Sequence, residues 1–260
     1  MYQAFMIVLR EGIESFLIVA IVFAYLRKTN RHQLLSAVNW GTLGAVLLSA
    51  FLGYFLWTNQ GVHQPLIEGI FASFTVVLVS SLVVHMWKVG PTFKQSMEKE
   101  ISEVTAKRNS RNAYLGIFLF TIVMISREGM EMTLLLFQIQ DPRIVSGIAL
   151  GVVAAAAVAV LWQQFGYLIN MKKFFQITSI FLLLFTLQIA MQAFHEFTEA
   201  GIFPNSQFLH NATEPYSAQG IYGKWYGNII FIACGLWLVF SLFLERTAKN
   251  KKTNQPLKAF

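Results

Sequence analysis

Seven long apolar segments, separated by polar connections, dominate the sequence and constrain what it can fold into. They span residues 3–26, 34–57, 66–87, 113–137, 144–165, 174–197 and 225–244. A helix needs about 20 residues to cross the hydrocarbon core of a bilayer, and each segment is long enough. None alternates polar and apolar residues as the strands of an outer-membrane barrel do. The sequence therefore predicts an all-α, polytopic membrane protein with seven transmembrane helices.

Composition supports a membrane setting and argues against two other classes of protein. The chain has 260 residues, of which 55% are hydrophobic and 13% charged, which is too apolar for an ordinary soluble domain. Its net charge of +7 would suit a nucleic-acid binder, but the basic residues lie between apolar segments rather than along one face, so we expect no nucleic-acid partner. Its single cysteine, Cys234, excludes a disulfide framework or thiolate cluster within one chain.

The basic residues predict how the chain is threaded through the membrane. Most follow the first, third, fifth and seventh segments, whereas the alternate connections carry only Arg143 and Lys224. Cytoplasmic connections are enriched in Lys and Arg. The protein is therefore expected in the cytoplasmic (plasma) membrane, with its N-terminus outside and its C-terminus in the cytoplasm.

Two connections are long enough to have structure of their own. The cytoplasmic connection after the third segment carries Met97, Ile101 and Val104 at helical spacing, which predicts an amphipathic helix. The outer connection over residues 201–224 is rich in turn-forming residues and is expected to form a lid or a docking surface.

Charged residues interrupt two of the apolar segments in the same pattern. The string FMIVLREGIE at residues 5–14 returns as IVMISREGME at residues 122–131. A charge at the centre of a membrane helix costs on the order of 2.5 to 3.5 kcal/mol on insertion scales. Six such residues therefore indicate a function; they are Arg10, Glu11, Glu14, Arg127, Glu128 and Glu131.

The match between the two motifs extends to the segments that follow them. The third and sixth segments resemble each other and end at His85 and His195, and the intervening segments both carry paired glycines. Three is an odd number, so the second copy would cross the membrane in the opposite sense. We therefore expect an inverted repeat, the pattern of secondary transporters with midplane substrate sites. The expected domain covers residues 1–246, with repeats at 1–88 and 112–199, a seventh helix at 225–244, and a basic cytoplasmic tail at 247–260.

Spacing within the motifs predicts a cation site. In each motif the glutamates are three residues apart, which places them on one helix face, and the arginine can pair with the glutamate four residues on. Four glutamates and two arginines leave a charge of −2 if all are ionised, and oxygen donors favour hard cations. Gly12 and Gly129 would let another helix or a partly hydrated ion approach. The alternative is that each arginine merely neutralises its neighbours and locks two helices together.

The paired Arg-Glu-Gly-x-Glu motifs, in the first and fourth of seven predicted spans, resemble those of the oxidase-dependent iron permease family, and the short chain resembles its bacterial branch. The resemblance implies iron uptake, with Glu11, Glu14, Glu128 and Glu131 as ligands of the transported ion and Arg10 and Arg127 as charge partners. It implies no tightly bound cofactor. Ferric iron, delivered after oxidation, is the expected substrate. The implied partners are an extracytoplasmic iron-binding lipoprotein and a haem peroxidase or ferroxidase, and a homo-oligomer is left open.

Further polar residues near the predicted outer face supply the alternatives. Glu68 and the group His195, Glu196 and Glu199 are candidates for an accessory metal site or entrance, or are simply interfacial. The same carboxylates would also suit a permease for another divalent or heavy metal. A remote alternative is an intramembrane metalloenzyme built on His195, Glu196 and Glu199; an enzyme is not expected.

Overall fold

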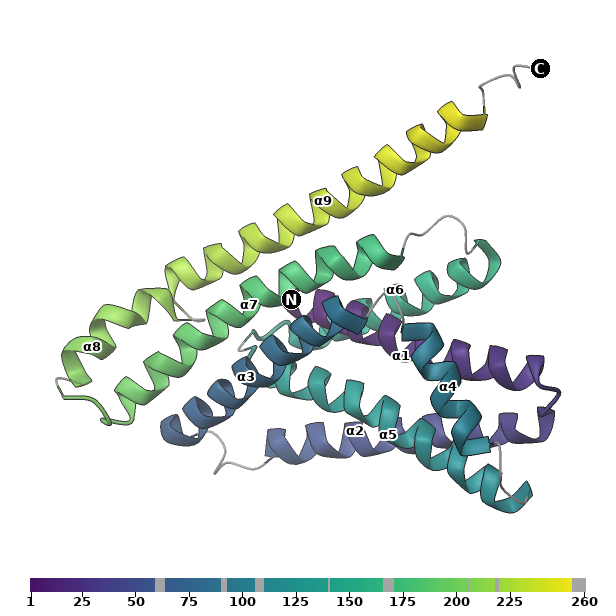
Figure 1. Ribbon diagram of the computed structural model, residues 1–260. Coiled ribbons are helices and arrows are strands. Elements are labelled where there is room, and N and C mark those ends of the chain that lie inside the picture. The colour runs from purple at the N-terminus through teal and green to yellow at the C-terminus, as the bar shows by residue number, and fades with distance from the viewer. Residues whose placement is uncertain are drawn as a thin grey trace.

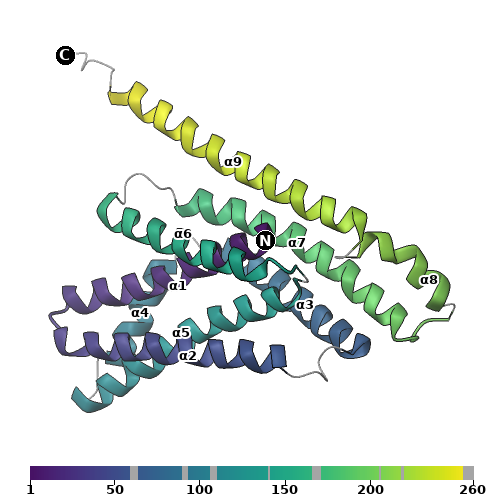
Figure 2. The same ribbon diagram turned by 180° about the vertical axis from the view of Figure 1, so that it is seen from behind.

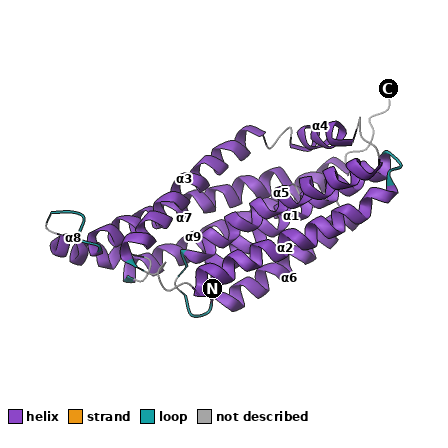
Figure 3. Cartoon of the chain, turned by 90° about the horizontal axis from the view of Figure 1, so that it is seen from below, coloured by secondary structure: helices purple, strands orange, loops and turns teal. Residues whose placement is uncertain are grey.

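The computed structural model describes residues 1–58, 64–89, 93–105, 110–139, 141–165, 171–204, 206–217 and 220–253, and these ranges contain helices and no strand (Figure 3). The long helices are α1 Tyr2–Lys28, α2 Leu35–Thr58, α3 Pro65–Val89, α5 Ser110–Phe137, α6 Ile144–Phe165, α7 Met171–Glu199 and α9 Ile221–Thr253. The short ones are α4 Phe93–Thr105, α8 Ser206–Thr213, and 3₁₀ turns at His32–Leu34 and Glu214–Tyr216. Each predicted segment coincides with one long helix, so the all-α prediction is confirmed.

Five of these helices are long and apolar enough to cross a membrane. The spans are His32–Thr58, Pro65–His85, Arg111–Phe137, Ile144–Leu161 and Phe175–Glu199. Large apolar side chains are exposed on the outside of the bundle, among them Trp40, Phe51, Trp57, Val153 and Leu236. An apolar surface of this extent fits a lipid environment. Seven membrane crossings remain a prediction, because these five are the spans found among the described residues.

The helix α9 is longer than the predicted seventh span. The helix was expected over residues 225–244, but it begins at Ile221 and continues to Thr253. Hydropathy marks where a helix leaves an apolar environment, whereas lysines and alanines can continue it as a helix in water. The first part of the predicted tail at 247–260 is therefore helical, and residues 254–260 lie outside the described residues.

The predicted amphipathic helix is confirmed as α4. Met97 and Ile101 are buried, and they pack in one cluster with Leu26 of α1 and Ala113 of α5. The turn after α1 also reaches this helix, because Arg31 donates a hydrogen bond to the Thr105 carbonyl over 2.8 Å. This end of the bundle therefore brings together the connections that the sequence predicts to be cytoplasmic.

The long helices pack in pairs that are far apart in sequence. α1 lies against α6, α2 against α5 and α3 against α7, while α1 also crosses α5 (Figures 1 and 2). Glycine allows close approach in two of these pairs. A Cβ at Gly41 of α2 would lie 2.9 Å from Thr121 Cβ of α5, and one at Gly147 of α6 would lie 3.1 Å from Ala4 Cβ of α1.

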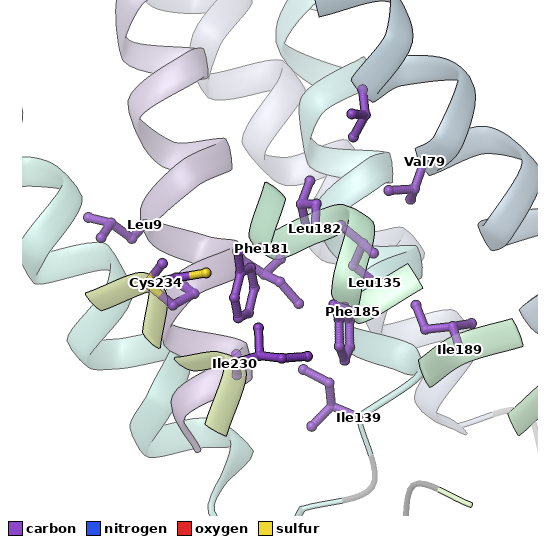
Figure 4. Packing of buried hydrophobic residues seen from close by; sticks show 14 of the residues in the cluster. Leu9, Val79, Leu135, Ile139, Phe181, Leu182, Phe185, Ile189, Ile230 and Cys234 are labelled. Carbon is purple, nitrogen blue, oxygen red and sulfur yellow. The ribbon is translucent and has the colours of Figure 1, made fainter. Parts of the chain in front are cut away.

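α7 forms the centre of the larger hydrophobic core. Its Phe181 and Phe185 rings stack with centroids 6.2 Å apart. Around them Figure 4 shows buried residues of α1, α3, α5 and α9, including Leu9, Val79, Leu135, Ile230 and Cys234. Leu9 and Leu135 belong to α1 and α5, the helices that carry the two motifs. The core therefore contains side chains from both motif helices as well as from α7.

Candidate metal site and its surroundings

The first motif is a buried ion-pair cluster on α1. Arg10, Glu11 and Glu14 are 2%, 0% and 8% exposed. The Arg10 guanidinium contacts both carboxylates, with Nη1 2.5 Å from Glu11 Oε1 and Nη2 2.8 Å from Glu14 Oε1. The predicted pairing over four residues is confirmed, and the same arginine also binds the neighbouring glutamate. One cation therefore serves two buried anions.

The second motif, on α5, has the same Arg-Glu-Gly-x-Glu pattern in a more open setting. Arg127 Nε donates to Glu131 Oε1 over 3.0 Å, which confirms the predicted pairing here too. However, the Arg127 side chain is 44% exposed, whereas Glu128 and Glu131 are buried. Glu128 Oε2 is buried without a hydrogen-bond partner among the described residues.

The crossing of α1 and α5 brings the two motifs together. Glu11, Glu128 and Glu131 each offer one carboxylate oxygen, and these oxygens lie within 4.8 Å of one another. Glu14 is not in this group, and its carboxylate contacts Arg10. Like Glu128, Glu11 has a buried Oε2 atom with no hydrogen-bond partner in the described structure. Buried carboxylate oxygens without a partner are costly, and a bound cation would satisfy them.

The motif glycines are contact points with neighbouring helices. A Cβ at Gly12 would lie 2.9 Å from Ala155 Cβ of α6, and one at Gly129 would lie 2.7 Å from Ser49 Cβ of α2. Of the two roles considered for these glycines, close approach of a second helix is the one that this packing requires. The motif on α1 thus packs closely against α6, and the motif on α5 against α2.

Two polar cavities lie next to one another beside the start of α1. The larger, of about 550 Å³, is lined by Gln3, Asp141, Gln188 and Asn228 together with Gln138 and Gln192. The smaller, of about 10 Å³, shares Gln138 and Gln192 and is closed by Phe137, Glu68 and Glu196. A cavity of that size has room for about one water molecule. Amide and carboxylate groups therefore line two neighbouring cavities, the larger of which borders the start of α1.

Asp141 gives the larger cavity a fixed negative group. Partial burial would raise the pKa of its carboxyl group, but the Met1 ammonium group and the Arg143 backbone N–H, at 2.7 Å, lower the pKa overall. The carboxylate therefore stays ionised and forms an ion pair with the start of α1.

Comparison with known proteins identifies the family. The sequence model of the iron permease FTR1 family matches residues 1–217. The chain belongs to the iron permease FTR1 family. It is 31% identical over 233 residues to the ferrous iron permease EfeU of Yersinia pestis, covering 86% of this chain and 82% of that protein. It is 33% identical over 216 residues to the ferrous iron permease EfeU of Escherichia coli O157:H7, covering 80% and 77%. No solved structure matches the chain significantly.

As a member of this family the protein is a membrane transporter and not an enzyme. The enzyme alternative required His195, Glu196 and Glu199 to act together, and the structure separates Glu196 from the other two. Glu196 accepts a hydrogen bond from Gln192 and borders the small cavity with Glu68. His195 and Glu199 instead group with His210 of α8, each offering a ligand atom within 4.8 Å of the others. The predicted accessory group is thus divided between two sites.

Sequence reasoning missed two features of the permease. One is the glutamine lining of the cavities, although Gln188, Gln192 and Glu196 recur every four residues on one face of α7 and so carried a readable signal. The other is His210, which lies in the outer connection. No periodicity in that connection indicates that α8 packs against α7, so spacing alone gave no reason to pair His210 with His195.

Proposed function

We propose that this permease carries iron across the cytoplasmic membrane into the cell through a site near the bilayer midplane, formed by Glu11, Glu128 and Glu131 with Glu14 beside it. The observation that carries this proposal is the buried convergence of three carboxylates from two separate motifs. Oxygen donors suit a hard or borderline cation such as iron. Arg10 competes for the same oxygens, which would keep iron from binding too tightly to be released.

Charge balance favours the ferrous ion as the species that crosses. Four motif glutamates and two arginines carry a charge of −2 when all are ionised, and one divalent ion balances it. The name of the two relatives, ferrous iron permease, supports the same choice. The ferric form expected from the sequence is the competing outcome that the uptake experiment below distinguishes.

The packing supports the inverted repeat that we propose for residues 1–88 and 112–199. If α1 is exchanged with α5 and α2 with α6, the contact of α1 with α6 becomes the contact of α5 with α2. The motif glycines follow the same exchange, since Gly12 meets Ala155 of α6 and Gly129 meets Ser49 of α2. We propose seven membrane-spanning helices, with α9 added to the two repeats and the N-terminus outside.

The proposed route begins at the cavity of about 550 Å³. An ion would exchange waters for amide and carboxylate oxygens there, pass Gln138 and Gln192, and reach the glutamate cluster. Rocking of the two repeats against each other would then open the site to the cytoplasm, as in other transporters built from inverted repeats. Delivery by an extracytoplasmic iron-binding lipoprotein with a haem peroxidase or ferroxidase, and assembly as an oligomer, remain predictions.

The test is uptake of radioactive iron by cells that express the permease or its Glu11→Gln and Glu128→Gln variants. Glutamine preserves the size of each side chain but removes its charge, so we expect both variants to fall to the background of cells without the permease. Glu103→Gln, on an exposed position of α4, is the matched control and should transport normally. Uptake is normalised to the amount of permease in the membrane.

Uptake is measured with ascorbate, which keeps iron ferrous, and with ferricyanide, which keeps it ferric. Faster uptake with ascorbate supports the ferrous assignment, and the reverse result overturns it. Normal uptake by the Glu11 and Glu128 variants would refute the proposed site. Competition by excess manganese or lead that matched competition by unlabelled iron would favour the broader metal permease.

A further inference from the structure

A second cluster of metal-ligating side chains lies at the α7–α8 end of the molecule (Figure 1). His195 and Glu199 are four residues apart on one face of α7, and α8 supplies His210. The two imidazole rings stack, with centroids 4.6 Å apart and planes at 22°. One ligand atom from each of the three residues lies within 4.8 Å of the other two.

A hydrogen bond orients the His195 ring. His195 Nδ1 lies 2.9 Å from Thr213 Oγ1. The Thr213 hydroxyl lies 2.9 Å from the Leu209 carbonyl and 3.2 Å from the His210 carbonyl, and it can donate its single proton to either. With its proton on one of these carbonyls, the hydroxyl accepts from Nδ1–H, which leaves Nε2 unprotonated in the neutral ring. A histidine oriented in this way through its other nitrogen is the usual arrangement of a metal ligand.

The other two members are open to an ion in different ways. His210 Nδ1 is buried without a hydrogen-bond partner among the described residues. Glu199 is exposed, while His195 is only 7% exposed. The cluster therefore combines two partly enclosed imidazoles with a carboxylate that an ion from solution can reach first.

We propose that His195, Glu199 and His210 form an exchangeable binding site for a divalent transition-metal ion, and that Fe²⁺ is its ligand in this permease. Two histidines and one carboxylate are the donor set of many ferrous centres, and three protein ligands leave positions for water. The imidazoles distinguish this site from the all-oxygen cluster of Glu11, Glu128 and Glu131. Its place on the outer face rests on the orientation proposed above, and there it would capture the ion before the ion enters the cavity.

The experiment titrates the purified full-length permease in detergent with Co²⁺, a spectroscopic substitute for Fe²⁺, and follows the cobalt absorption bands and the heat of binding. We expect His210→Ala and Glu199→Gln to weaken the imidazole-containing site at least about tenfold. Thr213→Val keeps the shape of the side chain but loses the acceptor for His195, and should weaken binding about tenfold. His85→Ala removes an exposed histidine on α3 and is the matched control.

Several outcomes would overturn the proposal. Unchanged Co²⁺ binding in Glu199→Gln would do so, because this residue is exposed and its variant should fold. An equal loss in His85→Ala would show that any histidine suffices. The Glu11→Gln and Glu128→Gln variants should retain the imidazole-containing site while losing uptake; loss of that site in these variants would mean that no separate outer site exists. This binding readout is independent of transport, so either proposal can fail alone.

Discussion

Arg10 and Arg127 occupy the same position in two copies of one motif, yet their surroundings differ. Arg10 is 2% exposed and contacts two glutamates, whereas the Arg127 side chain is 44% exposed and, among the described residues, pairs with Glu131. The second motif contributes both of its glutamates to the three-carboxylate cluster, and the first contributes Glu11. A repeated motif has thus produced one closed copy, whose arginine is buried between two glutamates, and one open copy, which supplies two of the three clustered carboxylates.

The largest expected difference between the two motifs is in iron uptake after substitution of Glu14 or Glu131. These two residues occupy the same motif position but lie in different surroundings. Glu131 belongs to the cluster, whereas Glu14 contacts Arg10 outside it. We expect Glu131→Gln to reduce saturable iron uptake to background. Loss of an orienting group typically costs about 10- to 100-fold in metal affinity, so Glu14→Gln should retain measurable uptake at high iron. Equal loss in both variants would instead favour the four-glutamate site expected from the sequence.

Stability should distinguish the two arginines by a smaller but clear margin. Arg10→Gln leaves Glu11 and Glu14 buried without their cation, and breaking a buried ion pair typically costs about 3–5 kcal/mol. Arg127→Gln removes a partly exposed pair, for which about 1 kcal/mol or less is typical. Thermal unfolding of the purified variants in detergent measures the difference. Comparable losses would contradict the description of one closed and one open motif.

Much of this arrangement could be predicted because it depends on length, polarity and spacing. The long helices follow from apolar segments, and Met97 and Ile101 at helical spacing predicted α4. The meeting of Glu11 with Glu128 followed from two matching Arg-Glu-Gly-x-Glu motifs at similar depths. These properties are local, or follow from a repeat that can be read directly in the sequence.

The features that could not be predicted depend on contacts between helices that are distant in sequence. The difference in exposure between Arg10 and Arg127 arises from neighbours that are distant in sequence, and the motifs themselves are alike. The contact of His210 with His195 depends on how α8 folds back onto α7. The continuation of α9 to Thr253 escaped prediction because hydropathy reports the solvent around a helix rather than its end.

The smallest expected effect is a difference in thermal stability between alanine variants of the two motif glycines, Gly12 and Gly129. A Cβ at Gly129 would clash with the Ser49 side chain more closely than one at Gly12 would approach Ala155. Over-packing a close contact typically costs about 1–3 kcal/mol, so both alanine variants should unfold at lower temperature, with Gly129→Ala the more affected. Gly235→Ala on α9 has no neighbouring atom within 4 Å and should leave the melting temperature nearly unchanged.

A second substitution tests whether each loss comes from the named contact. Removing the opposing side-chain atoms restores the space, so Ser49→Gly should recover stability in Gly129→Ala, and Ala155→Gly should do so in Gly12→Ala. The crossed combinations should give no recovery, because each glycine faces a different helix. Recovery in the matched pairs alone would show that the two motifs are packed equivalently against α2 and α6. The asymmetry between the motifs would then reside in their charges and exposure rather than in their backbone packing.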